Sequence, residues 1–476
     1  MSDVRISPNP TQQHPADNLY LQHQAAKQRG DKGAAARLLE SGLQVGPERP
    51  ACWYGLGVHL FNDRNIPGAV AGIKRALRIH PDEPCALTNL GIYLYHSGRY
   101  EEARAALTKA TTLAPDMPLG WSNLCLTLIA LNDIEGAIIA GTKSISLDPE
   151  NPSYRMALSF AFHYCGRYAE GFGMYESRFR FALPELANMP GDTWTGGPAQ
   201  NLLVVSEQGL GDTLQFARFI PLALKRVGKV IFACQPEMVG LMRQVMPAAV
   251  SVHPMPFIIP EHDAHTALLS LPTALGLTSE EIINTRSNYL GNLPLKFRRS
   301  LKGGKVVPEA YFRIEVPTIP TAPFKVGICW AGNPDQDNDK HRSATLDDFA
   351  LLAEVPGVQL YSLQVGPRSY DCKRYPGLVI NLGGKVRDFD DTVDVLQQLD
   401  AVVTVCTSVA HLSGTVGSVP TAVVLPYHGA YWVWAKDDRS KWYRNITLFR
   451  QRQMGVWADP IRSAADWLRA LMVEAK

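Results

Sequence analysis

Residues 202–218 read LLVVSEQGLGDTLQFAR, and this stretch decides the fold of the larger part of the chain. It opens with an apolar run of the kind usually buried as a strand. Gly209 and Gly211 follow, and glycine suits a tight turn between a strand and a helix. Asp212 can cap the helix that comes next. The stretch therefore predicts a strand, a glycine turn and a helix whose first amides face an anion or a reacting hydroxyl, with the Asp212 carboxylate beside them.

Strands and helices continue to alternate after this stretch, which predicts parallel sheets joined by right-handed crossovers. We expect residues 201–300 to form one Rossmann-like domain and residues 324–476 to form a second. The segment 301–323 between them belongs to a basic, proline-rich region and is interpreted as a crossover with a solvated charged face. Residues 184–200 are rich in proline and glycine and are interpreted as a linker.

The part of the chain before residue 184 repeats itself at an interval of 34 residues. Large apolar positions keep the same interval, and Gly57 and Gly91 align, whereas Cys125 stands where a third glycine would fall. The prolines and the small residues that recur in step are Pro47, Pro81, Pro115 and Pro149, and Ala35, Ala69, Ala103 and Ala137. The 34-residue period and the spacing of the prolines and small residues resemble the tetratricopeptide repeat (TPR), a pair of helices that stacks on its neighbours.

The resemblance predicts a TPR α-solenoid over residues 16–183, with imperfect first and last repeats and a disordered tail at 1–15. A concave groove for a protein partner is the favoured function, and a rigid spacer or a dimerisation element is the alternative. Asn89 and Asn123 occupy the same position in successive repeats. Their side-chain amides are candidates for holding the backbone of a bound peptide.

Composition and charge indicate which partners, metals and cellular compartment to expect. The net charge of +2 argues against nucleic acid or an anionic membrane as a partner. Eight scattered cysteines without a CxxC pair indicate a reducing compartment rather than disulfides or a zinc site. His262 and His265 flank Asp263, but no further ligand lies near, so we expect no metal. With neither a signal-peptide pattern nor a run of about 18 apolar residues, we expect a bacterial, cytoplasmic protein.

The last third repeats the strand–turn–helix pattern. The apolar run 399–405 breaks at Cys406, and a helix begins with Thr407 and Ser408, whose amides present its positive end. Earlier, the strand at 324–330 ends in a small-residue turn that contains Asn333. Ligands bind at the carboxyl ends of such strands, so this edge is the candidate binding edge.

Several separate motifs in order resemble the TPR-linked bacterial glycosyltransferases, which are related to the ADP-heptose:lipopolysaccharide heptosyltransferases. The resemblance spans about residues 194–460 and implies a GT-B fold, in which two Rossmann-like domains face each other across a nucleotide-sugar. The motifs are residues 207–218, 330–334, 341–343, 362–364, 388–392, 404–417 and 442–457.

The resemblance also implies roles for individual residues. The donor diphosphate would lie on the amides of Thr407 and Ser408, where fixed positive charge stabilises the departing nucleotide. Asp212 would be the general base of an inverting transfer, with Glu207 as the alternative carboxylate. The remaining donor-side candidates are Lys340 or Arg342 for charge neutralisation, His411 for a phosphate or the sugar, Gln364 for the ribose or base, and Asn333. A packing role within its helix is the alternative for His411.

The sequence departs from these relatives at Cys406, where they usually have aspartate. The choice of donor is therefore open, and so is a weakened activity. Asp388-Phe-Asp390 resembles the metal-binding motif of the other glycosyltransferase fold and is interpreted as coincidence, so we expect neither a metal nor another cofactor.

The expected function is sugar transfer from a nucleotide-sugar to a hydroxyl of a protein recruited by the repeats. This is similar to the logic of O-GlcNAc transferases and of TPR-bearing flagellin glycosyltransferases. Transfer to lipopolysaccharide or another surface glycan is one alternative, and a catalytically weakened TPR scaffold is the other.

Overall fold

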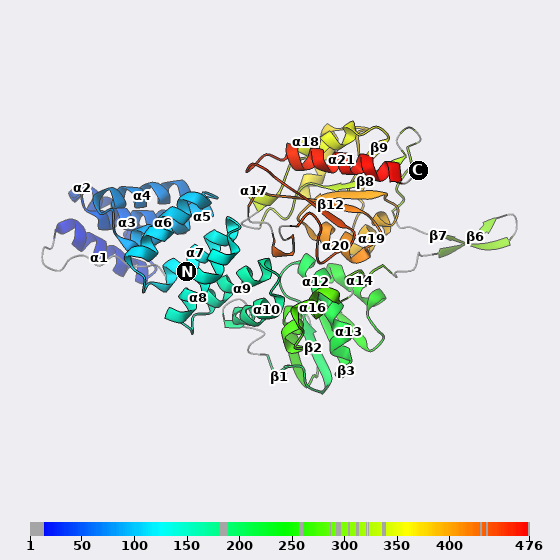
Figure 1. The fold of residues 1–476 in the computed structure, drawn as a ribbon, viewed down its shortest axis with the longest axis horizontal. Coiled ribbons are helices and arrows are strands. Elements are labelled where there is room, and N and C mark those ends of the chain that lie inside the picture. Colours follow the sequence, from blue (N-terminus) through cyan, green and yellow to red (C-terminus); the bar gives the residue numbers. More distant parts are fainter. Residues whose placement is uncertain are drawn as a thin grey trace. The chain divides into compact units, whose positions relative to one another are not determined.

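The chain divides into two compact units, Met1–Cys165 and Gly166–Lys476, and each is described by itself (Figure 1). The elements described in the first unit are helices, and the second unit contains parallel sheets covered by helices. The computed structural model describes residues 14–180, 189–256, 260–285, 287–291, 297–302, 305–310, 314–319, 321, 323–335, 339–428, 431–434 and 437–474, with the backbone alone at 297–302, 305–310 and 340.

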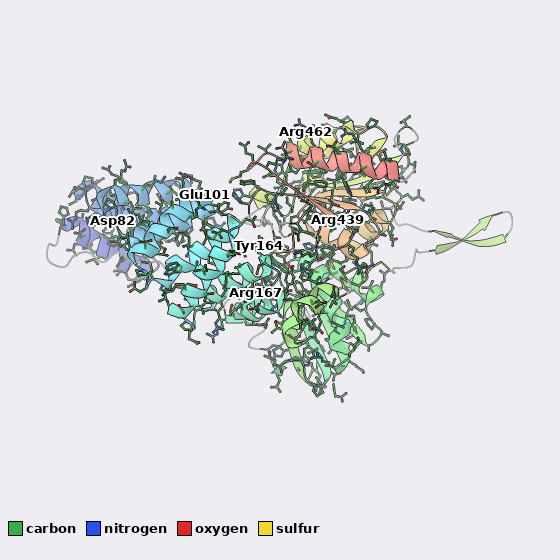
Figure 2. The ribbon with its side chains drawn as sticks, in the orientation of Figure 1. Asp82, Glu101, Tyr164, Arg167, Arg439 and Arg462 are labelled. Carbon is green, nitrogen blue, oxygen red and sulfur yellow. The ribbon has the colours of Figure 1, made fainter. Side chains whose placement is uncertain are left out.

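The first unit consists of antiparallel helix pairs with the period that the sequence predicts. The first helix of each pair starts with proline, which suits a first helical turn because its missing N–H is not needed there. Charged side chains such as Asp82 and Glu101 lie on the surface of this unit (Figure 2). The helices are α1 (Pro15–Gln28), α2 (Lys32–Val45), α3 (Pro50–Asn62), α4 (Ile66–Ile79), α5 (Pro84–His96), α6 (Tyr100–Leu113), α7 (Pro118–Ala130), α8 (Ile134–Leu147) and α9 (Pro152–Tyr164).

The recurring prolines after each pair are tied to the next pair by a side-chain hydrogen bond. Trp53 donates its indole N–H to the carbonyl oxygen of Pro47 over 2.8 Å, and Trp121 donates to that of Pro115 over 3.0 Å. Arg155 makes the equivalent bond with its Nε one repeat later. Each bond thus satisfies the carbonyl of a proline two residues beyond a helix end and joins that proline to the following helix.

Close packing within each pair explains the exchange of glycine for Cys125. A Cβ on Gly91 would lie 2.4 Å from Leu107 of the partner helix, so glycine is needed there. In the next repeat the small residue has moved to the other helix, because a Cβ on Gly141 would lie 3.1 Å from the sulfur of Cys125. These two pairs therefore each keep one small residue at the contact, on one helix or the other.

The turn inside each pair contains a residue with left-handed backbone, again every 34 residues. Glycine adopts this conformation without strain, whereas other residues pay about 1–2 kcal/mol. The residues are Gly30 (φ 78°), Arg64 (φ 61°), Gly98 (φ 76°), Asn132 (φ 67°) and Gly166 (φ 82°).

This turn gives a testable contrast. Gly30→Ala should destabilise the first helix pairs by about 1 kcal/mol, because open space surrounds the position and only backbone strain is added. Arg64→Gly should be close to neutral, because the strain it relieves is offset by the larger entropy of glycine in the unfolded chain. Amide hydrogen exchange of the first-unit helices in the full chain measures both changes. Equal losses from the two substitutions would contradict this explanation.

The second unit begins with α10 (Tyr168–Tyr175) and η1 (Glu176–Arg180) and continues into a five-stranded parallel sheet of order β1-β5-β2-β3-β4. We call residues 192–291, built around this sheet, the first lobe. Its elements are β1 (Asp192–Thr193), β2 (Ala199–Val205), α12 (Leu210–Phe216), η2 (Ala217–Phe219), α13 (Ile220–Leu224), β3 (Val227–Cys234), α14 (Pro236–Val245), β4 (Val250–Pro254), β5 (Ala264–Ala267), η3 (Leu268–Ser270), α15 (Leu271–Ala274) and α16 (Ser279–Asn284).

A six-stranded parallel sheet of order β10-β9-β8-β11-β12-β13 organises the second lobe, residues 324–474. Between the lobes in sequence, β6 (Phe297–Lys302) and β7 (Lys305–Ala310) form an antiparallel hairpin. The elements of the second lobe are β8 (Phe324–Cys329), α17 (Asp339–Arg342), α18 (Leu346–Phe349), η4 (Ala350–Glu354), β9 (Val358–Ser362), η5 (Pro367–Arg374), β10 (Val379–Asn381), α19 (Phe389–Leu396), β11 (Ala401–Val405), α20 (Ser408–Val416), β12 (Thr421–Leu425), η6 (Trp432–Trp434), β13 (Ile446–Arg450) and α21 (Ala458–Glu474).

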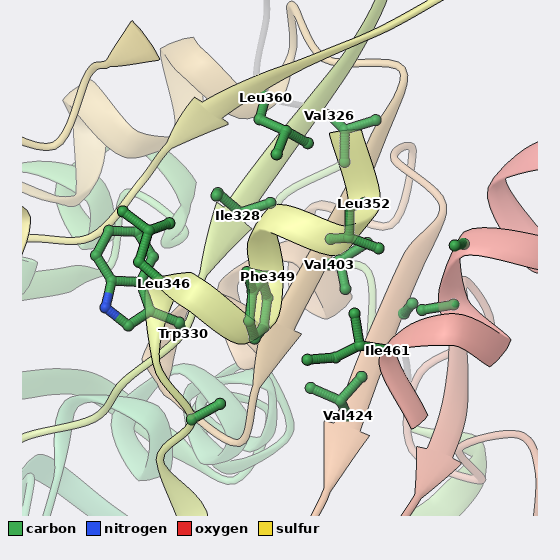
Figure 3. Close-up of a cluster of buried hydrophobic side chains, with 14 of the residues drawn as sticks. Val326, Ile328, Trp330, Leu346, Phe349, Leu352, Leu360, Val403, Val424 and Ile461 are labelled. Carbon is green, nitrogen blue, oxygen red and sulfur yellow. The ribbon is translucent and has the colours of Figure 1, made fainter. Parts of the chain in front are cut away.

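The core of the second lobe lies between this sheet and the helices on one of its faces (Figure 3). Phe349 of α18 and Ile461 of α21 pack against alternate residues of the strands, such as Ile328 and Val403. β11 is buried along its whole length, as expected for a central parallel strand covered on both faces. The prediction of helical repeats followed by parallel α/β structure is thus confirmed.

Candidate functional site

The quoted stretch forms β2, a tight turn and α12. Gln208 has left-handed backbone with φ 62°, which is strained for a residue with a side chain. Asp212 occupies the first turn of α12, where its Oδ2 accepts a hydrogen bond from the Gly209 amide over 3.1 Å. The carboxylate is therefore fixed at the carboxyl end of β2, the edge where parallel sheets place ligands.

Glu207, the alternative base, is held by an ion pair. Arg178 of η1 donates from Nε to Oε2 over 2.9 Å and from Nη2 to Oε1 over 2.6 Å, and both side chains are buried. The Leu269 amide donates to Oε1 as well, over 3.2 Å. Both oxygens thus anchor the turn to neighbouring elements, and this arrangement favours a structural role for Glu207 over that of a base.

Asp212 has a partner from the second lobe. The hydroxyl of Tyr431, which lies between β12 and β13, donates to Oδ1 of Asp212 over 2.8 Å. The Asp212 side chain is half-buried. Burial raises its pKa, and the negative charge of Glu207 acts in the same direction, while the hydrogen bonds from Tyr431 and Gly209 oppose the rise. A carboxyl with a raised pKa is the kind that proton transfer near neutral pH requires.

The start of α20 occupies the equivalent place in the second lobe, after β11. Thr407 is the residue before the helix, and its hydroxyl lies 3.2 Å from that of Thr404. Among the side chains that the structure describes, none caps this helix end. Ser408 begins the helix and is partly exposed, so the positive end of α20 is available to a polar group.

Arg342 supplies positive charge near this helix end. Its Nε lies 3.8 Å from Oδ1 of Asp339. Burial lowers the pKa of His411 in α20 to about 3, and the charge of Arg342 adds to that effect. Arg342 is thus close enough to α20 to act on its residues. The side chain of Lys340, the other candidate cation, lies outside the described residues.

His411 packs α20 against α12. Its Nδ1 is 2.9 Å from the hydroxyl of Tyr443, and its ring centre is 5.1 Å from that of Trp434. A Cβ on Gly211 would lie 2.8 Å from the His411 ring, so glycine allows the two helices to meet. These contacts favour the packing alternative for His411 over a direct contact with phosphate or sugar.

Gln364 and Asn333 have local partners. The Gln364 side chain is buried, accepts from the Ala331 amide over 3.0 Å and donates to the Ala331 carbonyl over 3.1 Å. It therefore joins the loops after β8 and β9. Asn333 is exposed and accepts from the Asp335 amide in its own turn.

The two asparagines of the repeats also bond within their unit. Asn89 is buried and donates to the hydroxyl of Tyr54 on α3 over 2.8 Å. Asn123 donates to the carbonyl of Leu119 on its own helix over 2.8 Å. Asn89 thus links neighbouring repeats, which explains its place in the repeat without a bound peptide.

Two residues of the site were not predicted from the sequence. Tyr431 lies 219 positions from Asp212, and its only sequence signal is a location after an apolar strand. Arg178 lies in the predicted last repeat, and nothing in the sequence pairs it with Glu207. The indole N–H of Trp434 donates to the sulfur of Cys406 over 3.0 Å.

The DxD-like motif and the histidine pair have structural partners. Asp388 accepts from the Asp391 amide at the start of α19, and Asp390 accepts from Gln244 of the first lobe over 2.7 Å. Both ring nitrogens of His262 lie within 3 Å of backbone carbonyls. In the described part of the chain, no three acidic, histidine or cysteine side chains gather as a metal site would need. The helices described there are all too short or too polar to span a bilayer.

The tetratricopeptide-repeat family matches residues 20–84 and 84–117. Protein FlbA of Caulobacter vibrioides is 24% identical over 335 residues, covering 64% of this chain and 53% of FlbA, so the chain spans about half the length of this curated relative. A solved structure of Pseudomonas aeruginosa PilF is 23% identical with a TM-score of 0.32, covering 35% of this chain and 75% of that one. MamA of Desulfovibrio magneticus is 22% identical with a TM-score of 0.32, covering 37% and 97%.

The first unit is therefore built of tetratricopeptide repeats, a scaffold that binds protein partners.

Proposed function

We propose that this chain is an inverting glycosyltransferase of GT-B architecture that transfers a sugar from a nucleotide-sugar to a hydroxyl of a protein held by the repeats. One observation supports it above the others: Asp212, at the carboxyl end of β2, is hydrogen-bonded to Tyr431 of the second lobe. A carboxylate at the meeting point of two strand–turn–helix motifs is what a base between acceptor and donor requires.

In this proposal Asp212 takes the proton of the acceptor hydroxyl while the oxygen attacks the anomeric carbon. The bond from that carbon to the diphosphate breaks on the opposite side, so the configuration inverts. The departing diphosphate gains negative charge, which the start of α20 and Arg342 would stabilise. The start of α20 and Arg342 both belong to the described site, and in this proposal they stabilise the diphosphate without a metal ion.

The alternative proposal is a TPR scaffold without transfer activity, and Cys406 is the observation that favours it. Burial raises the pKa of the Cys406 thiol, so a neutral group stands where the relatives usually carry a carboxylate. Because Trp434 donates to this sulfur, the position is integrated into the fold rather than exposed to a substrate.

A screen of nucleotide-sugars by thermal shift separates the two proposals. A donor at about 100 times its Kd should stabilise the protein by about 2.7 kcal/mol, and the same compound should be turned over to free nucleoside diphosphate. Nucleoside diphosphates without a sugar serve as the control for product binding. If none of the nucleotide-sugars stabilises the protein, the result would support the scaffold proposal.

The acceptor is tested by removing the repeats. A chain that lacks residues 1–150 should still release nucleoside diphosphate from the donor but should no longer modify a protein acceptor, because the recruiting surface is gone. The measurement is transfer of labelled sugar to proteins of the source cell, compared with donor hydrolysis by the same sample. Unchanged protein modification would refute recruitment by the repeats, and transfer to glycan alone would favour a surface-glycan acceptor.

A further inference from the structure

We propose that Tyr431 is a positioning residue for Asp212, which it orients and keeps ionised through a hydrogen bond made only when the two lobes are packed together. This inference rests on the proposed function for its catalytic meaning. Tyr431 belongs to the second lobe and Asp212 to the first. Their hydrogen bond of 2.8 Å therefore makes the orientation of the carboxylate depend on contact between the lobes.

The carboxylate of Asp212 keeps hydrogen-bonding capacity for an acceptor hydroxyl. Oδ1 of Asp212 takes one hydrogen bond from Tyr431, and Oδ2 takes one from the Gly209 amide. Each oxygen of a carboxylate can accept about two hydrogen bonds, so each keeps capacity for another donor. Two fixed bonds define the plane of the carboxylate, and the half-buried side chain can still meet an incoming hydroxyl.

The hydroxyl of Tyr431 is itself held in place. Its ring lies 6.0 Å from that of His411 at 78° and 5.3 Å from that of Trp432. Trp432 packs in turn against Trp442 at 5.2 Å and against Phe172 at 5.9 Å. Tilted and edge-to-face rings at these distances restrict motion, so the Tyr431 hydroxyl is a rigid donor rather than a mobile surface group.

The ionisable groups that interact with Asp212, or that feel its charge, come from several elements. The charge of Glu207 opposes ionisation of Asp212, and Tyr431 is the side chain that favours it most directly through its hydrogen bond. Removal of the Tyr431 hydroxyl should therefore raise the pKa of Asp212 further. The groups are Tyr175 from α10, Glu207 from the turn, Cys406 after β11, Tyr431 before η6, and Tyr443 after η6.

Because the pKa of Asp212 affects the stability of the fold, the inference can be measured without a substrate. Because the pKa of Asp212 is raised in the folded protein, its carboxyl favours folding at low pH and loses that contribution as the pH rises through the folded-state pKa. Asp212→Asn cannot ionise, so it should raise Tm at neutral pH and lose this advantage below about pH 4. The midpoint of that change reports the protonation of Asp212.

The experiment compares this midpoint with and without the Tyr431 hydroxyl in the full chain. The Tm difference caused by Asp212→Asn is measured from about pH 4 to pH 9, once in the otherwise natural protein and once with Tyr431→Phe. The expected result is a midpoint at higher pH with Tyr431→Phe. Tyr375→Phe is the matched control, because it also removes a tyrosine hydroxyl that donates to an aspartate, Asp347, over 2.9 Å. The control should leave the midpoint unchanged.

A nucleotide-sugar that the protein turns over adds a kinetic readout. Tyr431→Phe should lower kcat by about 10- to 100-fold near neutral pH, the size of one hydrogen bond to a charged group, with KM for the donor unchanged. The rate should recover at higher pH, which a merely structural loss would not do.

The outcomes separate the two ideas. An identical midpoint in both backgrounds overturns the role of Tyr431, whatever the activity. A shifted midpoint in a protein that turns over no nucleotide-sugar refutes the proposed function and leaves the control of Asp212 by Tyr431 standing.

Discussion

Arg178→Met should destabilise the Gly166–Lys476 unit by about 3–5 kcal/mol, because it leaves the carboxylate of Glu207 buried without its partner. The pair is nearly inaccessible, with side-chain exposure of 1% for Arg178 and 2% for Glu207. Arg178 also donates to Glu176 and to Ser270, so its loss removes the centre of a network that joins η1, the β2–α12 turn and η3. Denaturant unfolding of the full chain, followed in the second unit, measures the effect.

Two control variants give this prediction its meaning. Arg178→Met combined with Glu207→Leu removes both charges and should recover most of the lost stability, because apolar residues often replace a buried ion pair without cost. Arg469→Ala breaks an exposed pair with Asp466 in the same unit and should cost less than about 1 kcal/mol. A cost for Arg178→Met no larger than that of Arg469→Ala would show that Glu207 does not depend on Arg178.

The repeats were predictable because their signal is periodic. Prolines and alanines at a fixed interval specify helix ends and close helix contacts, and the structure has both. The left-handed turn was harder to predict, since Arg64 and Asn132 stand where the other repeats have glycine. The exchange at Cys125 and Gly141 had a signal of its own, because the two residues are separated by the same interval as Gly91 and Leu107.

The site was only partly predictable, for a physical reason. The turn that places Asp212 is local, so a short motif suffices to predict it. Its partner Tyr431 comes from another sheet, and only the packing of α12 on α20 brings the two together. Gln364 and Asn89 show why an amide is a weak signal, since an amide side chain that suits a ligand suits a neighbouring backbone or hydroxyl equally well.

The boundary between the units illustrates the same limit. The sequence predicts an imperfect last repeat over residues 152–183, whereas the compact units divide between Cys165 and Gly166. The second helix of that repeat, α10, carries Tyr168 and Phe172, whose rings contact Trp432 and Phe216 of the second unit. A helix with the repeat pattern can thus belong to the next unit when its apolar face packs there.

Asp212→Asn should reduce turnover of the nucleotide-sugar by about 10²- to 10⁴-fold, the usual contribution of a general base. Asparagine has nearly the same shape and keeps an oxygen that can accept from the Gly209 amide, so the start of α12 should persist. The donor contacts the proposal assigns to α20 and Arg342 do not involve this side chain, so the Kd of the nucleotide should stay within about twofold of the natural value. Initial rates of nucleoside diphosphate release and a thermal-shift titration measure the two quantities.

Asp348→Asn is the matched control for this loss. Asp348 occupies the same position in the first turn of α18, where its Oδ2 accepts from the Thr345 amide over 2.9 Å. The two substitutions thus alter the same kind of helix cap, but only Asp212 also bonds to Tyr431. A large loss with Asp212→Asn and none with Asp348→Asn would assign the loss to proton transfer rather than to capping. Equal activity of both variants would refute Asp212 as the base, and because Glu207 is already bound at both oxygens by Arg178, the proposed transfer would then lack a carboxylate at this turn to perform it.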